Sequence, residues 1–265
     1  MKRRKSITLL VCTVAVWPLN GLLIALALAS PAFARADGAS LAAEAGDAAI
    51  RFQAYLDGVA KDAGRPDFSK PPASDLLGKV FNLKQLEALP PSQADDLPWL
   101  MDWATAAHGV YKSILFFGIA PPVTLRDDEA ALQRNITDYE DQEAAAINFQ
   151  LHILAREIPA TFAFLDQLPP AERTPVRLEG IKKMRVSFAE TLLNYLGWIA
   201  AGMKPANARL VSAAIRDTGA AWVTAILPAD RPNIFAMLDK AQSAAKDEET
   251  RGNLSAFGSL LAKAQ

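Results

Sequence analysis

Apolar residues recur at intervals of three or four along most of the chain after residue 40. In the first such segment, Leu41, Ala45, Ala48 and Phe52 share one face of a helix. No segment shows the sustained alternation of apolar and polar residues that is typical of a half-buried strand. The pattern therefore predicts an all-α protein built as a multi-helix bundle.

Prolines and one glycine support the boundaries of the predicted helices. Proline is tolerated in the first turn of a helix but disrupts its middle, and most prolines fall where the periodicity ends. Gly202 is expected to end the helix in which Leu178, Ile181, Phe188 and Leu192 face inward. The predicted helices cover residues 41–59, 75–81, 83–89, 95–117, 127–157, 175–201, 205–227, 232–245 and 248–263.

A repeated pattern raises the hypothesis of an internal duplication. Pro159 and Pro232 lie in stretches that both read I-L-x4-P-x2-F-A-x-L-D, with an offset of 73 residues. Under this hypothesis, residues 127–200 and 205–265 are duplicated helical units that superpose and bury a face against each other. The alternative is chance similarity between helices that are rich in Ala and Leu and break at a proline.

The N-terminus has the features of a secretory signal peptide. Four basic residues at positions 2–5 precede an uncharged run from Ile7 to Ala34, which ends with the small residues Ala32 and Ala34. We predict that residues 1–34 are this signal peptide.

The remainder, residues 35–265, is predicted to be a single exported domain. Its N-terminal helices span residues 35–125, and residues 126–265 form the half to which the duplication hypothesis applies. These assignments predict a periplasmic or secreted protein of bacterial type. The alternative is an inner-membrane protein anchored through residues 7–34, because an uncharged run of this length can span a bilayer.

Charge and cysteine content exclude several classes of function. The 265 residues include 28 basic and 29 acidic ones, and the leader contains four of the basic residues. Its removal leaves 24 basic and 29 acidic residues, a net charge of −5. We therefore expect no nucleic-acid partner, since phosphate binding needs a basic surplus. The only cysteine, Cys12, lies in the leader, so the exported part has no thiol for catalysis or metal binding.

Motifs of metal, nucleotide and hydrolase sites are missing from the sequence. The two histidines, His108 and His152, are 44 residues apart and match no metal-ligand spacing. There is also no glycine-rich phosphate loop and no G-x-S-x-G nucleophile motif. We expect no metal and no cofactor, and the sequence identifies no catalytic residue.

Five residues are candidates for ligand binding. Trp99, Trp103 and Tyr111 belong to a dense aromatic segment that also holds His108, and Glu143 interrupts an otherwise apolar helix face. The aromatic residues either line a pocket or fill the core at helical spacing. Glu143 is either buried with a raised pKa, which would suit a proton donor or cation site, or it reaches solvent past the neighbouring alanines.

A basic cluster supplies candidates for anion binding. The candidates for anion binding in this cluster are Arg177, Lys182 and Arg185. They could bind a carboxylate, a phosphate or an acidic partner. The alternative is a solvated helix face on which interleaved glutamates pair with these cations.

Three classes of function are compatible with the sequence. The favoured one is a non-catalytic, exported module that binds another envelope protein or is otherwise associated with the envelope. The first alternative is a carrier of a small apolar ligand or lipid in a cavity between helices. The second is a metal-independent enzyme that uses carboxylates such as Glu143.

The leader assignment predicts that the mature protein begins at Arg35. Cleavage after Ala34 would remove the basic cluster and the uncharged run together. The measurement is the intact mass of protein purified from its own envelope. A mass that still includes residues 1–34 would contradict cleavage and support the anchored alternative.

Overall fold

The computed structural model describes residues 35–119 and 129–264, so the predicted signal peptide lies outside the described residues. Within those ranges the chain is all-α and contains no strand, which confirms the predicted fold class. Each predicted segment is helical over most of its described length. The helices are α1 (Arg35–Lys61), α2 (Ala73–Val80), α3 (Leu83–Ala88), α4 (Leu97–Leu115), α5 (Glu129–Asp138), α6 (Glu140–Gln167), α7 (Pro175–Ala201), α8 (Pro205–Ala225), α9 (Arg231–Ala244) and α10 (Glu248–Lys263).

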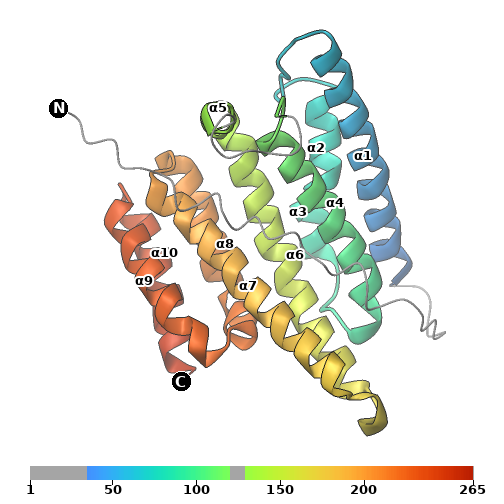
Figure 1. Cartoon of the computed structure of the whole chain (residues 1–265), viewed down its shortest axis with the longest axis vertical. Coiled ribbons are helices and arrows are strands. Elements are labelled where there is room, and N and C mark those ends of the chain that lie inside the picture. The colour runs from blue at the N-terminus through green and yellow to red at the C-terminus, as the bar shows by residue number, and fades with distance from the viewer. Residues whose placement is uncertain (1–34, 120–128, 265) are drawn as a thin grey trace.

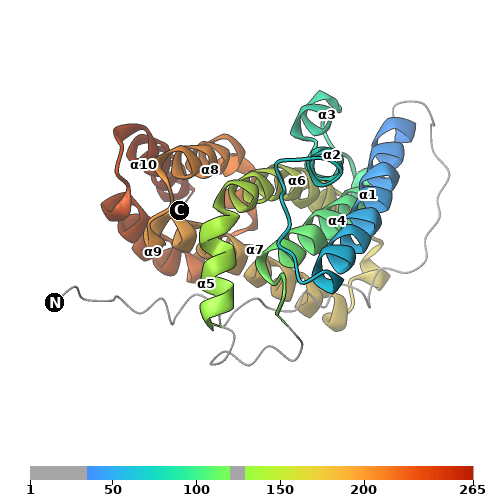
Figure 2. The same ribbon diagram turned by 90° about the horizontal axis from the view of Figure 1, so that it is seen from above.

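The helix α6 lies at the centre of the bundle. It packs between α4 on one side and α8 on the other, while α1 and α2 extend the α4 side and α10 extends the α8 side. The long helix α7 crosses the bundle and packs mainly against α9 (Figures 1 and 2). Short 3-10 turns η2 (Ala94–Asp96), η3 (Pro170–Glu172) and η4 (Pro228–Asp230) precede α4, α7 and α9.

Local capping explains where several helices begin and end. The side chain of Thr174 accepts a hydrogen bond from the amide of Arg177 at the start of α7, and Asp247 does the same for Thr250 at the start of α10. Such caps satisfy amide donors that have no partner within the helix. Gly202 ends α7 with a φ of 99°, as predicted, because glycine adopts this left-handed backbone without strain.

The structure differs from the predicted helix 127–157 at two places, one inside this range and one beyond its end. A break at Tyr139, with φ −114° and ψ 18°, separates α5 from α6. Helix α6 then continues through Pro159 to Gln167, and Pro159 is exposed. Pro232, by contrast, lies in the first turn of α9. The two prolines thus occupy different backbone settings, and the duplicated helical unit is not shown.

No helix in residues 35–119 or 129–264 is both long enough and apolar enough to cross a membrane. The described helices instead bury their apolar faces in one continuous core. Trp103 on α4 is fully buried in this core, and its indole donates a hydrogen bond of 2.8 Å to the carbonyl of Val80 on α2. Its ring centroid lies 5.4 Å from that of Phe149 on α6. Trp103 therefore joins three helices.

We predict that Trp103→Ala destabilises the protein by about 3–5 kcal/mol, because it leaves a large cavity and an unpaired carbonyl. Chemical denaturation followed by circular dichroism gives this value. Trp99→Ala is the matched control, since Trp99 is only half-buried on the same helix. Equal losses in the two variants would contradict the central role of Trp103.

Candidate functional site

Three of the five predicted ligand-binding residues meet in the interior of the bundle. His108 and Tyr111 come from α4 and Glu143 comes from α6. They are joined there by polar side chains that the sequence reading did not select, and we call the whole group the polar cluster. Its members are His108, Tyr111, Glu143, Gln150, Tyr195 and Trp198.

Hydrogen bonds connect the polar cluster across α4, α6 and α7. The hydroxyl of Tyr195 donates to Oε1 of Gln150, and His108 also hydrogen-bonds the Gln150 side chain. Trp198 hydrogen-bonds the Tyr111 hydroxyl. Burial raises the pKa of both tyrosines, so their hydroxyls stay protonated at neutral pH. Burial lowers the pKa of His108, and the positive charge of Lys112 lowers it further.

Glu143 is the most unusual member of the polar cluster. The residue is fully buried, and neither carboxyl oxygen has a hydrogen-bond partner among the described residues. Burial raises its pKa to about 8, with a smaller contribution from the nearby charge of Glu140. The expectation that Glu143 reaches solvent is therefore wrong. At neutral pH its carboxyl group is mostly protonated and neutral.

A further unsatisfied polar group lies on the same helix. The Nε2 of Gln150 is buried without a partner in the described part of the chain. Glu157, also buried, has its pKa raised to about 7 by burial. Such groups cost stability unless they are paired, so α6 carries a polar interior at a free-energy cost.

The two remaining predicted residues lie outside the polar cluster. Trp103 belongs to the core contact described above. Trp99 is half-buried, and its indole donates a hydrogen bond of 3.2 Å to the carboxylate of Asp96. The structure therefore places these tryptophans in packing positions on α4 rather than beside His108, Tyr111 and Glu143.

The three predicted anion-binding residues lie in different surroundings. Arg177 pairs with the carboxylate of Glu172 at 2.7 Å. Arg185 donates to the carbonyls of Ala225 and Thr224 at the end of α8. Lys182 is exposed. The structure does not bring these cations together around one site.

The end of α6 and the start of α7 form a hairpin that extends below the rest of the bundle in Figure 1. Two large apolar side chains at its tip are exposed, Val176 by 69% and Leu178 by 53%. Leu178 and Ile181 were expected to face inward with Phe188 and Leu192, but only the latter two are buried. The reason is that α7 continues beyond the helices that would cover its first turns. Half-buried apolar side chains on the hairpin are Phe162, Phe164, Leu165, Leu168, Ile181 and Met184.

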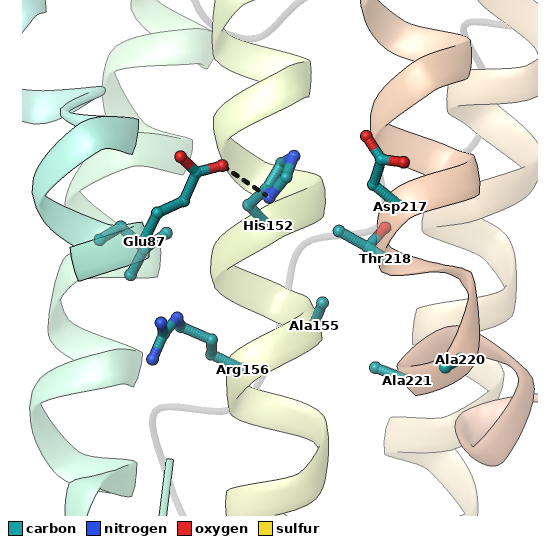
Figure 3. A pocket seen from close by; sticks show the side chains of 9 residues that line it. Glu87, His152, Ala155, Arg156, Asp217, Thr218, Ala220 and Ala221 are labelled. Carbon is teal, nitrogen blue, oxygen red and sulfur yellow. Dashed lines mark ion pairs between the residues drawn. The ribbon is translucent and has the colours of Figure 1, made fainter. Parts of the chain in front are cut away.

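A groove opens on the surface where α3, α6 and α8 meet. Its volume is about 340 Å³. Figure 3 shows Glu87 from α3 on one side of His152 and Asp217 from α8 on the other, with Arg156 one helical turn further along α6. The other lining residues are Leu86, Ala155, Thr218, Ala220 and Ala221.

Charges of both signs surround His152. Its Nδ1 lies 3.8 Å from Oε1 of Glu87. Burial lowers the pKa of His152, the negative charges of Glu87 and Asp217 partly offset this effect, and Arg156 lowers the pKa further. His152 is therefore mainly neutral at neutral pH. A neutral imidazole has one donor and one acceptor nitrogen for a ligand.

Little in the sequence indicates this groove. His152 and Arg156 are one turn apart on a helix, and this spacing is visible in the sequence. Glu87 and Asp217 come from helices more than 60 residues away on either side, and no local pattern relates them to His152.

Neither a metal-binding arrangement nor a similar known protein identifies the site further. Within the described ranges, no group of three or more His, Cys, Asp or Glu residues is arranged to hold a metal ion. Comparisons with protein families, with curated proteins and with solved structures found no match to this chain.

Because the buried carboxyl groups have raised pKa values, we predict that the stability of the protein depends on pH. The pKa of Glu143 is about 8 in the folded protein and near its ordinary value of 4.5 in the unfolded chain. The folded state therefore binds more protons between these values, and the free energy of unfolding falls as the pH rises through this window. The loss from Glu143 is on the order of 5 kcal/mol at most above pH 8. Glu143→Gln should remove this part of the loss and be more stable than wild type at pH 9.

Urea denaturation at a series of pH values between 5 and 9 measures the effect. Glu179→Gln, an exposed change on α7, is the control and should leave the pH dependence unaltered. A Glu143→Gln variant with the wild-type slope would show that Glu143 does not titrate in this window.

Proposed function

We propose that this chain is an exported, non-catalytic module that binds another protein of the cell envelope through the α6–α7 hairpin. The observation that supports the proposal is the exposed continuation of the buried face of α7 at Leu178. The export part of the proposal rests on the leader sequence.

The spacing on α7 favours a helical partner. Leu178 and Ile181 precede Leu192 and Phe188 by multiples of seven residues, so they continue the same face of the helix. Inside the bundle this face is buried by other helices. At the tip of the hairpin the same face is exposed, and its apolar residues have the spacing against which an amphipathic helix of a partner would pack.

Charge on the hairpin indicates the polar character of the partner. Arg173, Lys182 and Lys183 are exposed around the tip, whereas residues 35–265 as a whole carry a net charge of −5. A partner helix with acidic residues beside its apolar stripe would complement this basic region. Its association should weaken with added salt, because exposed charges are screened.

The carrier and enzyme alternatives stay predictions. The polar cluster contains the protonated carboxyl of Glu143 that an acid catalyst would use, but the groove described above is lined by other residues. The aromatic segment expected to line a carrier cavity contributes Trp103, Tyr111 and Ile114 to the core.

Site-specific photo-crosslinking in the producing cells tests the proposed function. A benzophenone amino acid replaces Leu178 in one variant and Ile50 in the control. Ile50 on α1 is 71% exposed, which makes it at least as accessible as Leu178. We expect a discrete protein adduct from position 178 and none from position 50.

The identified partner is then purified and titrated. Leu178→Ser and the double change Lys182→Glu/Lys183→Glu should each weaken binding about tenfold, as is common for residues at the centre of an interface. Ile50→Ser should leave the affinity unchanged. An adduct with lipid alone, or no adduct at position 178, would overturn the proposal of a protein partner.

A further inference from the structure

The groove between α3, α6 and α8 combines an apolar floor with charged walls. Ala155, Ala220 and Ala221 have short side chains that leave room above the helix surface, and Leu86 adds an apolar contact. The volume of about 340 Å³ lies at the lower end of the range for small-molecule sites. These features suit a short aliphatic segment with polar ends.

Charges of both signs surround the groove. Glu87 and Asp217 are acidic, and about half of each side chain is exposed. Arg216 binds Oδ1 of Asp217 at 2.7 Å and so neutralises part of its charge. Arg156 adds a second positive charge, and the negative charges of Asp96 and Glu87 act on it. A ligand that carries separated charges of both signs matches this arrangement.

Arg156 is held in place while it keeps spare donors. Its two terminal nitrogens donate to the carbonyls of Pro90 and Leu89, each at 2.7 Å. A guanidinium group has five N–H donors, so three remain beyond these two bonds. The fixed side chain therefore needs little ordering to receive a carboxylate.

We propose that this groove binds a short zwitterion, with its ammonium group between Glu87 and Asp217 and its carboxylate at Arg156. Neutral His152 lies between the two acids and can accept a hydrogen bond from the ammonium group. His152 and Arg156 are four residues apart, which corresponds to about 6 Å along the axis of α6. An ω-amino acid with three methylene groups spans a similar length.

Four ligands of matched length separate the contributions of the positive and the negative charge to binding. 4-Aminobutanoate has both charges, 1,4-diaminobutane has only positive charge, succinate has only negative charge and 1,4-butanediol has none. Proton NMR of untagged protein reports binding cleanly, because the chain has two histidines and His108 lies in the polar cluster. We expect 4-aminobutanoate to shift the His152 ring resonances in a saturable manner and to leave those of His108 in place.

Variants test each end of the proposed ligand. Glu87→Gln combined with Asp217→Asn should weaken the binding of 4-aminobutanoate at least about tenfold. Asp57→Asn on α1 is the control and should have no effect. Arg156→Gln should abolish the preference for 4-aminobutanoate over 1,4-diaminobutane. If Arg156→Gln does not fold, the acidic double variant and the four ligands still decide the question.

Three results would overturn the proposal. The first is the absence of a saturable His152 shift with 4-aminobutanoate. The second is equal binding of 1,4-diaminobutane, succinate or butanediol to wild-type protein. The third is unchanged binding in the acidic double variant. This site is separate from the hairpin, so its failure would leave the proposed partner binding untouched.

Discussion

The burial of α6 between α4 and α8 is the interaction on which the rest of the structure depends. Phe149 and Ile153 on α6 are almost completely buried, and Phe149 meets Trp103 of α4 in the core. A helix that is covered on several faces has few positions left for polar groups, so each polar residue on α6 has consequences for stability. The same helix nevertheless carries Glu143 toward the polar cluster and His152 toward the groove.

Polar residues on α6 therefore indicate where the bundle departs from simple apolar packing. Glu143, Gln150 and Glu157 are seven residues apart, a spacing that keeps them on one face of the helix. Burial of acids and amides without full pairing costs free energy that leucines at the same positions would not. Folding tolerates this cost because the surrounding helices bury a large apolar area. The protonated state of Glu143 reduces the cost at neutral pH, since a neutral carboxyl group is easier to bury than a carboxylate.

The helices could be predicted from the sequence because their causes are local. Apolar spacing, the cap at Thr174 and the glycine at 202 act within a few residues. The break at Tyr139 could not be read in this way, because helical periodicity continues across it. The meeting of His108 with Gln150 and Tyr195, like that of His152 with Glu87 and Asp217, depends on how separate helices pack. The exposure of Leu178 could not be predicted from the sequence for the same reason. Its spacing predicts an inward face, whereas its exposure depends on where neighbouring helices end.

The unbroken course of α7 has a mechanical consequence. Its 27 residues form a rod about 40 Å long, with Leu178 near one end and Tyr195 near the other. Arg185, bonded to two carbonyls at the end of α8, holds the rod close to its middle. From Phe188 to Ile199 one face of the rod is buried in the bundle, so its second half is fixed and the exposed tip is its free end.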